Sequence, residues 1–314
     1  MNHTILVTGA TGFVGRGLIE RLRSAGRPAR SAVRTGNGAA DTVAVGDIGP
    51  DTDWLPALEG IDTVIHLAGR AHVTARERDA LSHFRKVNTA GTQRLAEQAE
   101  QAGVRRFVLV SSVKAAADRT DEHALLEIDA ANPRTPYGVS KLEGERALWD
   151  AARNMEPVVL RPPLVYGPGV KANFRSLLRL VDSGFPLPLG SVRNRRNVIS
   201  RDNLVDAIAA ATTASGVVGK TFYLTEAPPL STPALIRGLA KGLGRPARLI
   251  PFSPAVIALV AALAGRREAA DSLLGSLAIN GSAFRAATGW QPPVAQQAAF
   301  DNVAAWYRQA VSEP

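Results

Sequence analysis

The sequence predicts an α/β fold, a doubly wound parallel sheet accompanied by a smaller C-terminal lobe. Short β-branched runs alternate with longer helical patterns through the first half, which is typical of βαβ units. A glycine-rich turn joins the first of these runs directly to the first helical pattern. The chain has 314 residues, enough for one large domain or two ordinary ones.

Five strands and three helices are expected in the first half. The strands are Thr4–Thr8, Ala29–Val33, Thr63–Leu67, Phe107–Ser111 and Val158–Leu160. The helices are Gly12–Ala25, Thr89–Ala102 and Pro136–Arg153. Gly26 and Gly103 follow the first two helices as stop signals, and Asn88 is a candidate cap of the second, because an Asn side chain can accept from free helix N–H groups.

The pattern changes after Tyr166. Gly167–Gly169 reads as a turn, and the proline-rich stretch Phe185–Gly190 fits neither a helix nor a central strand, so an inserted segment is expected there. An amphipathic helix at Asp202–Ala214 and an apolar strand at Lys220–Thr225 then return the chain to the sheet.

Composition excludes several classes of protein. With 46% hydrophobic and 21% charged residues, the chain is neither disordered nor collagen-like. The absence of cysteine removes disulfides, thiolate metal sites and iron–sulfur clusters, and no metal site is expected. Met1–Thr4 does not resemble a signal peptide, and the apolar run Phe252–Gly265 is shorter than the roughly 20 residues of a membrane helix. We therefore expect a cytoplasmic protein without membrane insertion.

The net charge of +9 raises the question of a nucleic-acid partner. The 37 basic residues are spread along the chain, and the tightest group, Arg193, Arg195 and Arg196, has no interleaved aromatic residues. This pattern does not favour nucleic-acid binding, because such proteins concentrate positive charge on one patch or stripe.

The glycine turn predicts a dinucleotide site of the Rossmann type. The first strand runs into Gly9-Ala10-Thr11-Gly12-Phe13-Val14-Gly15. Glycines are needed here for a tight turn, for close approach of a pyrophosphate and for close packing of helix on strand, and the helix N-terminus faces the phosphates. The alternative is an ordinary Gly-rich turn.

A domain division follows from this site. We expect residues 1–166, with about 196–226, to form the dinucleotide-binding domain. Residues 167–195, with about 227–314, would form a lobe, mostly of short helices and Pro/Gly loops, that binds the substrate. This lobe would lie at the carboxyl ends of the strands, where ligands of open α/β sheets bind.

The end of the second strand bears on which nicotinamide cofactor binds. It reads Ser31-Ala32-Val33-Arg34, without the acidic residue that usually holds the adenosine ribose of NAD. Arg34 can pair with the 2′-phosphate of NADP, so NAD(P) is expected with NADP slightly favoured. A solvated arginine at a strand end is the alternative.

Tyr137 and Lys141 lie four residues apart, on one face of a helix that begins at Pro136. A phenol with a pKa of about 10 is a weak acid–base group at neutral pH, and a nearby cation favours its ionised form. Ser111 and Ser112 close a strand between the glycine turn and this helix. The alternative is a core tyrosine beside a solvated lysine.

These features resemble the extended short-chain dehydrogenase/reductases, the nucleotide-sugar epimerase/dehydratase family. Matching landmarks, in order, are Gly9–Gly15, Gly46–Ile48, His66–Gly69, Asn88 with Gly91-Thr92, Ser111-Ser112, Tyr137–Lys141, Arg161-Pro162, Val165–Gly169, Arg196–Ile199 and Ala287–Trp290 with Pro292. The resemblance covers nearly the whole chain, and it implies the fold, a nicotinamide cofactor and a homodimer formed through the helix that carries Tyr137.

The resemblance also implies roles for individual residues. Tyr137 would be the acid–base group, Lys141 would tune it and hold the nicotinamide ribose, and Ser112 would hydrogen-bond the same sugar oxygen. The implied cofactor residues are Gly9, Thr11, Gly12, Phe13, Val14, Gly15, Arg34, Asp47, Ile48, Leu67, Ala68, Gly69, Tyr137, Lys141 and Pro163. The implied substrate residues are Ser112, Asn173, Phe174 and Arg196, with Arg266, Arg267 and Asp271 as a possible second clamp or a solvated helix end.

Departures from the family pattern reduce the number of reactions that the chain is expected to catalyse. Family dehydratases carry an Asp-Glu pair where this chain has Val113-Lys114, and Asp121-Glu122 lie too far downstream to replace it. Ala115–Ala117 and Leu164 also depart from the pattern of the ordinary galactose epimerases. The segment Arg161–Phe174 instead resembles a bacterial subgroup associated with O-antigen and capsule sugars.

Two reactions fit that subgroup, and both use the same residues. The main expectation is reduction of the 4-keto group of a UDP-2-acetamido-2,6-dideoxy-4-hexulose, with hydride from NAD(P)H and a proton from Tyr137. The alternative is a UDP-hexose 4-epimerase that retains NAD. A third hypothesis is a non-catalytic nucleotide sensor on the same fold. The presence of Ser112, Tyr137 and Lys141 does not favour it.

Overall fold

The computed structural model describes residues 4–36, 39–71, 79–265 and 267–312. Its centre is a parallel sheet of seven strands in the order β3-β2-β1-β4-β5-β6-β9. The strands are β1 (Thr4–Thr8), β2 (Ala29–Val33), β3 (Thr42–Ala44), β4 (Ile61–His66), β5 (Arg106–Val110), β6 (Glu156–Arg161) and β9 (Lys220–Tyr223). Strand order reverses between β1 and β4, so the carboxyl ends of these two strands border the crevice where ligands of such sheets bind.

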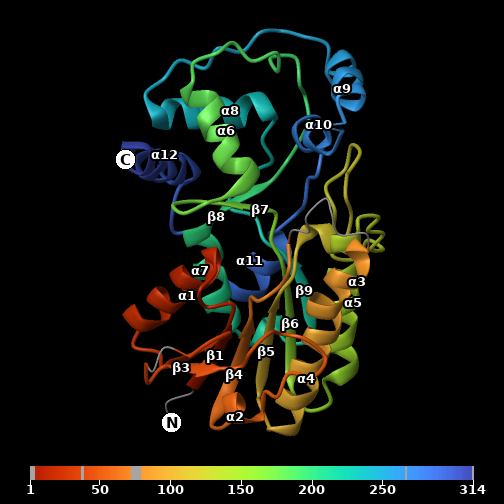
Figure 1. The fold of residues 1–314 in the computed structure, drawn as a ribbon, viewed down its shortest axis with the longest axis vertical. Coiled ribbons are helices and arrows are strands. Elements are labelled where there is room, and N and C mark those ends of the chain that lie inside the picture. Colours follow the sequence, from red (N-terminus) through yellow and green to blue (C-terminus); the bar gives the residue numbers. More distant parts are fainter. Residues whose placement is uncertain (1–3, 37–38, 72–78, 266, 313–314) are drawn as a thin grey trace.

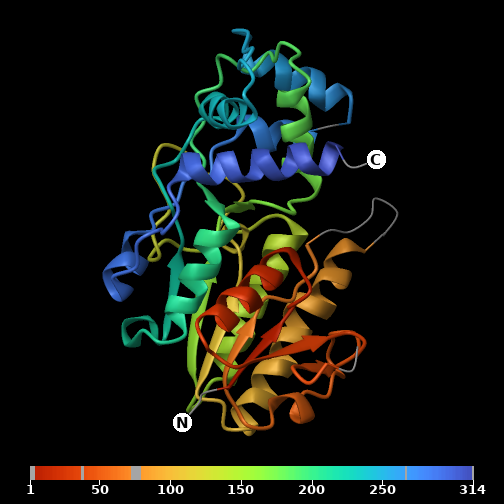
Figure 2. The same cartoon turned by 90° about the vertical axis from the view of Figure 1, so that its left-hand side faces the viewer.

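Helices cover both faces of the sheet (Figures 1 and 2). One face carries α1 (Phe13–Ser24), α7 (Arg201–Ala211) and α11 (Ser282–Thr288). The other carries α2 (Leu55–Leu58), α4 (Gly91–Gln101) and α5 (Pro136–Ala151), with the short α3 (Ala80–Phe84) beside α5. The short 3-10 turns η2 (Val113–Ala115) and η3 (Ser215–Val217) lie in connecting segments.

Alternation along the strands explains why both faces are covered. Ile5 and Val7 of β1 belong to the core under α1 and α7, whereas Leu6 between them belongs to the core under α4 and α5. Successive strand side chains point to opposite faces, so an all-apolar strand buries its side chains only between two helical layers. The predicted doubly wound sheet is confirmed.

A helical lobe stands above the carboxyl ends of the strands (Figure 1). It consists of α6 (Ala172–Asp182), α8 (Thr232–Leu243), α9 (Pro254–Leu263), α10 (Arg267–Leu274) and α12 (Gln296–Ser312). Its core includes Tyr166, whose ring lies 5.4 Å from that of Phe174 and 5.0 Å from that of Phe300. A two-stranded ribbon of β7 (Leu164–Tyr166) and β8 (Val198–Ser200) lies between sheet and lobe.

Several sequence expectations differ from the structure in detail. The strands β3, β7 and β8 and the helix α6 were not expected, because three-residue strands carry little periodicity and the turn at Gly167–Gly169 obscures the helix that follows. The lobe is not limited to short helices, since α12 has 17 residues. Within the expected 227–314 segment, α11 packs on the sheet, where Phe284 joins the core of β9 and α7.

The expectation that Asn88 caps a helix was wrong. Asn88 lies inside a π-helical turn, η1 (Arg85–Ala90), which continues into α4, and its side chain is buried. Its neighbours α3 and α5 pack against η1, so tertiary packing extends the helix past the position where local sequence suggests a start.

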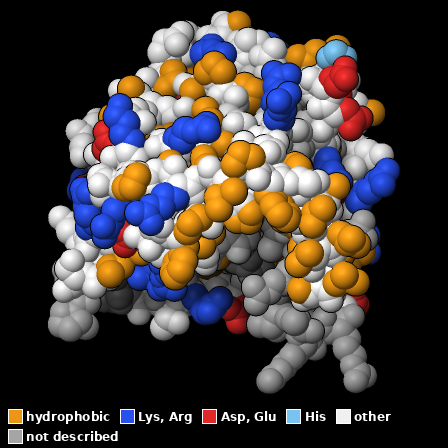
Figure 3. All heavy atoms as spheres, turned by 90° about the horizontal axis from the view of Figure 1, so that it is seen from above, with side chains coloured by type: hydrophobic (Ala, Val, Ile, Leu, Met, Phe, Trp, Pro, Cys, Tyr) orange, Lys and Arg blue, Asp and Glu red, His pale blue; other side chains and the backbone are white. Residues whose placement is uncertain are grey.

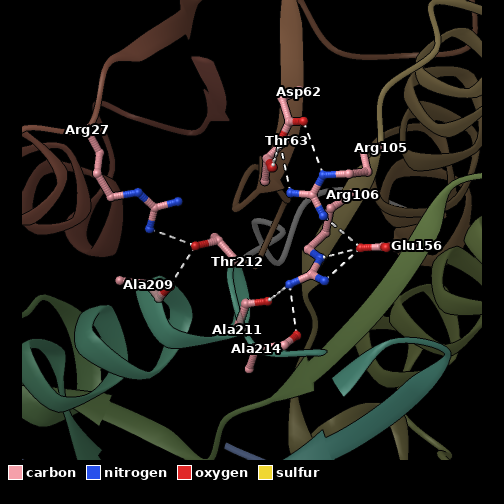
Figure 4. Close-up of polar contacts among 10 residues, drawn as sticks. All are labelled: Arg27, Asp62, Thr63, Arg105, Arg106, Glu156, Ala209, Ala211, Thr212 and Ala214. Atoms are coloured by element: carbon pink, nitrogen blue, oxygen red, sulfur yellow. Dashed lines mark hydrogen bonds and ion pairs between the residues drawn. The ribbon is translucent and has the colours of Figure 1, made fainter. Parts of the chain in front are cut away.

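Arginine side chains link neighbouring elements at the amino ends of the strands (Figure 4). The buried Arg106 guanidinium donates to Glu156 Oε2 at 2.7 and 2.8 Å and to the carbonyl oxygens of Ala211 and Ala214 at 3.1 and 2.9 Å. The two carbonyls lie at the end of α7, where a cation is favourable for the helix dipole. This network joins β5, β6 and α7. Among the described residues, no helix is long and apolar enough to cross a membrane.

Candidate active site

The turn after β1 has the geometry that its glycines predict. Gly9 has φ +68°, and a Cβ there would lie 2.8 Å from the backbone nitrogen of Ala68. A Cβ on Gly15 would lie 2.1 Å from the Gly9 carbonyl oxygen, so α1 could not approach the turn with any larger residue. Gly12 occupies the N-cap of α1 without a side-chain cap, and no acidic residue lies in the first turn. The end of α1 is therefore suited to an anion.

A cleft of about 560 Å³ opens beside this turn, between the ends of β1, β2 and β4. Eight of the predicted cofactor residues line it: Gly9, Thr11, Gly12, Arg34, Asp47, Ile48, Ala68 and Gly69. Sequence reasoning missed Ala32, Val33, Val45, Gly46, Arg70, Lys86 and Val87, which complete the wall. Most of these come from strand ends whose order in the sheet is unknown before the fold is.

Seven predicted cofactor residues lie outside the wall of this cleft, and Tyr137 and Lys141, described below, are two of them. Val14 and Leu67 pack on the sheet core, and Gly15 acts through the close approach of α1. Phe13 packs towards the helical lobe, with the Arg201 guanidinium 6.0 Å from its ring centre. Pro163 is buried in the segment between β6 and β7. Their implied cofactor roles stay predictions.

Arg34 is paired with a carboxylate at the mouth of the cleft. Its Nε lies 2.6 Å from Asp47 Oδ1, and the two side chains are 79% and 82% exposed. The arginine expected to meet a 2′-phosphate therefore already has an anionic partner, itself one of the predicted cofactor residues. A phosphate bound to Arg34 would have to approach this carboxylate, which repels it.

Tyr137 lies at the start of α5 beside Ser112. Thr135 caps the helix by accepting from Gly138 N at 3.3 Å, and the Tyr137 ring packs edge-on against Phe84 at 5.8 Å. A Cβ on Gly138 would lie 2.3 Å from the Lys114 carbonyl oxygen, so this glycine lets the segment after Ser112 approach the helix. The Tyr-Gly pair thus places the serine hydroxyl within reach of the phenol.

The expected lowering of the tyrosine pKa by Lys141 was wrong for the protein without ligand. Burial raises the pKa of Tyr137, and a side-chain hydrogen bond with Ser112 opposes this rise. The lysine does not contribute, because its Nζ donates instead to the Val110 carbonyl oxygen at 3.0 Å. Desolvation therefore dominates at the phenol.

Lys141 is buried at the boundary between the helix and the cleft. Burial lowers its pKa to about 8, against a smaller opposite effect of Glu145. Its Nζ lies 3.8 Å from where a Cβ on Gly69 would stand, so the ammonium group adjoins the wall of the cofactor cleft. Tyr137 thus lies beside Ser112, and Lys141 lies one helical turn further along α5, next to the cleft wall; their catalytic roles stay predictions.

Asn88 connects the cleft to the catalytic helix, a role that sequence reasoning missed. Its Oδ1 accepts from Arg70 N at 2.8 Å, and its Nδ2 donates to Arg70 O and to Ser140 Oγ, both at 3.0 Å. A Cβ on Gly144 would lie 2.2 Å from the Asn88 carbonyl oxygen, so α5 touches the π-helical turn. Because Ser140 adjoins Lys141 in sequence, this contact fixes the lysine relative to the cleft wall.

A second pocket lies in the helical lobe and contains the predicted substrate residues Asn173, Phe174 and Arg196. The rest of its lining is Leu164, Leu177, Val198, Leu230, Ser231, Thr232, Leu235, Ser272 and Leu273. Arg196 donates to the Gly275 carbonyl oxygen at 3.0 Å, and burial, followed by repulsion from Arg119, lowers its pKa. A positively charged group thus stands in a largely apolar pocket.

One residue of the possible second clamp, Asp271, lies among the described side chains, and the clamp itself stays a prediction. Asp271 forms an ion pair with Arg119, a residue that sequence reasoning missed. Arg119 also acts on Arg196, so two guanidinium groups and one carboxylate meet beside the pocket. The Arg266 and Arg267 side chains lie outside the described residues. Asp121 and Glu122 are exposed in the segment after Arg119.

Fold and site together define an enzyme that binds a nicotinamide dinucleotide at the topological switch point of its sheet. The turn at Gly9–Gly15 fits a pyrophosphate, Lys141 adjoins the cleft, and the buried Ser111 hydroxyl has no hydrogen-bond partner among the described residues. Residues 5–224 match the family model for the NAD dependent epimerase/dehydratase family. The chain belongs to this family and is an NAD-dependent enzyme.

Individual relatives agree with this assignment. The chain is 38% identical to a UDP-glucose 4-epimerase of Vibrio cholerae, with 99% of this chain and 97% of the relative covered. A crystal structure of a short-chain dehydrogenase/reductase superfamily protein from Agrobacterium tumefaciens with bound NAD has a TM-score of 0.78 at 23% identity, covering 99% of each chain. A UDP-N-acetylglucosamine 4-epimerase from Bacillus cereus has a TM-score of 0.80 at 19% identity, with 98% of this chain and 99% of the other covered. The two structures share the fold.

Proposed function

We propose that this protein is an NAD-dependent 4-epimerase of UDP-hexoses. The supporting observations are the hydrogen bond of Tyr137 with Ser112, the place of Lys141 beside the wall of the dinucleotide cleft, and the similarity of the chain over 99% of its length to a UDP-glucose 4-epimerase. The comparisons favour this alternative over the 4-ketoreductase that was the main expectation from the sequence. Both reactions remain chemically open to the same three residues.

NAD, rather than NADP, is the proposed cofactor. The Arg34–Asp47 pair places a carboxylate where a 2′-phosphate would lie, and the comparisons lend no support to an NADP preference. The first turn of α1 would hold the pyrophosphate, and Lys141 the ribose of the nicotinamide. When bound, NAD supplies a ring that accepts a hydride and returns it.

The proton transfers belong to Tyr137. As a phenolate it takes the proton of the sugar 4-hydroxyl while carbon 4 loses its hydride, which leaves a 4-keto sugar and a neutral phenol. In the reverse step Tyr137 returns the proton to the oxygen as carbon 4 regains hydride on its other face. Ser112 donates a hydrogen bond to the sugar oxygen and stabilises its developing negative charge.

The phenolate requires help that the ligand-free site does not provide. Burial raises the pKa of Tyr137, so the ionised form needs a cation close to it. Lys141 is the buried cation on the same helix face, four residues away. We propose that cofactor binding draws its Nζ from the Val110 carbonyl towards the ribose and the phenol, which lowers the pKa of Tyr137 in the complex.

The nucleotide diphosphate is assigned to the second pocket. Arg196 would supply a guanidinium group for the phosphates and Asn173 an amide at the N-terminal turn of α6, with Arg119 beside the pocket once it exchanges Asp271 for phosphate. The binding energy of this remote part of the substrate holds the sugar at Tyr137. Replacement of Arg119 by Met should raise KM for the UDP-sugar about tenfold and change kcat little, because the residue touches only the non-reacting diphosphate.

Product analysis separates the two reactions. The purified protein with NAD and UDP-glucose should form UDP-galactose until the epimers reach equilibrium, with no net NADH produced. A 4-ketoreductase would instead consume one NADH or NADPH for each UDP-4-keto sugar. Consumption of NAD(P)H with a UDP-2-acetamido-2,6-dideoxy-4-hexulose, in the absence of epimerisation, would favour the reductase and its role in O-antigen or capsule sugars.

We also propose a homodimer formed through α5, the association implied by the family resemblance. On this helix Glu143 forms an ion pair at 2.6 Å with Arg85 of η1, and α4 packs beside it. Sedimentation should give twice the chain mass of 33.1 kDa. A charge reversal of the exposed Asp150 on α5, Asp150→Arg, should weaken the dimer if α5 forms the interface.

A further inference from the structure

The helix α9 presents an apolar face to solvent. All ten of its residues, Pro254–Leu263, are apolar, and none is buried. Val256, Leu259, Val260 and Leu263 are 42%, 61%, 60% and 82% exposed. They follow the spacing i, i+3, i+4, i+7, so they lie on one face of the helix. Ile257, outside this set, packs on the core of the lobe.

Neighbouring segments extend this face. Ile250 and Phe252, just before the helix, are 47% and 45% exposed. Phe185 is 72% exposed and comes from the segment that pairs with it, since Leu187 N donates to Arg248 O and Ile250 N donates to Leu187 O. We call the exposed side chains of Phe185, Ile250, Phe252, Val256, Leu259, Val260 and Leu263 the apolar crest. Soluble proteins seldom expose so many large apolar side chains together without a binding role.

The positive charge of the protein is concentrated in the same lobe. Residues 167–195 and 227–314 carry 13 basic and 5 acidic residues, a net charge of +8. All other residues together carry 24 basic and 23 acidic residues, a net charge of +1. The even spread of basic residues seen in the sequence therefore hides an uneven charge balance, because the acidic residues lie almost entirely in the sheet half.

Basic side chains are exposed in the same lobe as the apolar crest. Arg245 and Arg248 lie just before α9, with Arg245 in an ion pair with Asp182 at 3.3 Å, and Arg237 and Lys241 lie on α8. Figure 3, seen from above on the lobe, shows hydrophobic side chains in a broad band, with Lys and Arg on its borders and fewer Asp and Glu. An apolar face with a cationic border is complementary to a surface that is apolar inside and anionic outside.

We propose that the helical lobe docks on the surface of an anionic lipid bilayer through the apolar crest. The crest enters the boundary of headgroups and acyl chains, while the surrounding arginines and lysines contact lipid phosphates. No described helix is long enough to cross the membrane, so the association is peripheral. A second copy of this chain fits less well, because two lobes of net charge +8 would repel each other.

The docking helix α9 is connected to the proposed substrate pocket. The helix α10, which follows α9 and packs against it, contributes Ser272 and Leu273 to that pocket. The membrane-bound enzyme would therefore take its substrate close to the bilayer surface.

Vesicle sedimentation with the full chain tests the proposal. We expect wild-type protein to sediment with vesicles of phosphatidylcholine containing 30% phosphatidylglycerol. Binding to vesicles of phosphatidylcholine alone should be at least tenfold weaker, because several cations contribute near an anionic surface. Leu259→Glu should weaken binding to the anionic vesicles about tenfold or more, since it removes a large apolar group and adds a negative charge.

Leu55→Glu is the matched control. Leu55 is also an exposed leucine, 40% exposed, but it lies on α2 at the opposite end of the molecule, so its substitution should leave binding unchanged (Figure 1). Epimerisation of UDP-glucose in solution should be retained in both variants, which shows that they fold. Absence of wild-type binding to anionic vesicles, or equal binding by Leu259→Glu, would overturn the proposal. A lower oligomeric mass for Leu259→Glu alone would overturn it in favour of a second copy on the crest.

Discussion

The two ends of the parallel strands use charged and polar groups differently. At the amino ends, Arg106 reaches Glu156 and two helix carbonyls, and Arg105 reaches Asp62 at 3.0 Å, so these charges find partners within the chain (Figure 4). At the carboxyl ends, Gly12 leaves the start of α1 uncapped, and the buried Ser111 hydroxyl has no hydrogen-bond partner among the described residues.

This difference indicates where stability and function lie. Groups that are satisfied inside the chain contribute to folding free energy, whereas groups left without partners become available to a ligand. Lys141 at the carboxyl end lowers the stability of the folded protein, because its ammonium group is buried and, among the described residues, donates to one carbonyl oxygen. Substitutions at the two ends should therefore have separable effects on activity and on stability.

The largest effect is expected from Tyr137→Phe. Removal of the phenolic hydroxyl should lower kcat for epimerisation by about 10³-fold, because proton transfer by a positioned group contributes about 10²–10⁴-fold. The free energy of unfolding should change by no more than about 1 kcal/mol, since the variant loses the hydrogen bond with Ser112 but no longer has to desolvate the hydroxyl. Steady-state kinetics and urea unfolding measure the two quantities.

Tyr307→Phe serves as its control, because Tyr307 is a buried tyrosine on α12 in the helical lobe. This variant should retain kcat within about twofold. Equal losses in the two tyrosine variants would contradict a special role for Tyr137.

Arg106→Met should act in the opposite way. It leaves the carbonyls of Ala211 and Ala214 without their cation and leaves Glu156 with Arg105 alone, so the free energy of unfolding should fall by about 2 kcal/mol. The value of kcat per folded molecule should stay unchanged, because the substitution lies at the far end of the sheet. A fall in kcat without a fall in the free energy of unfolding would contradict the claim that the amino ends of the strands serve stability and not activity.

Lys141 should make the free energy of unfolding of the protein depend on pH. Burial lowers its pKa from 10.5 to about 8, so between these values the unfolded chain binds a proton that the folded protein does not. Stability should therefore rise with pH across this window, by on the order of 1–3 kcal/mol relative to Lys141→Met. Urea unfolding of both proteins at pH 8 and pH 10 measures this difference. The same change with pH in both proteins would contradict a buried charge at this position.

The smallest effect concerns the choice of cofactor. Asp47→Ser removes the carboxylate beside Arg34, so affinity for NADP should rise about tenfold relative to NAD. Fluorescence titration with both reduced cofactors measures the ratio. Tighter binding of NADP than NAD by the wild-type protein would show that Arg34 receives a 2′-phosphate despite its carboxylate partner.

The sequence predicts the parts of the site that local chemistry dictates. Gly9 and Gly15 are required by close backbone contacts within one turn, and Tyr137 and Lys141 share a helix face because of helical spacing. These features depend on residues near each other in the chain, so pattern and spacing are sufficient to find them.

Features that depend on the assembled fold could not be found in this way. The hydrogen bonds of Asn88 with Arg70 and Ser140 join three separate segments. Arg119 pairs with Asp271, which lies 152 residues later in the sequence. The pKa of Tyr137 also responds to burial, which spacing does not reveal.

Retention of the hydrogen at carbon 4 tests the proposed function most directly. The purified protein should be incubated with NAD and UDP-glucose carrying deuterium at carbon 4, and the products followed by NMR. The account predicts UDP-galactose with deuterium still at carbon 4, formed without net NADH and about 10³-fold more slowly by Tyr137→Phe. Absence of UDP-galactose, together with oxidation of NADH or NADPH by a UDP-4-keto sugar, would contradict it.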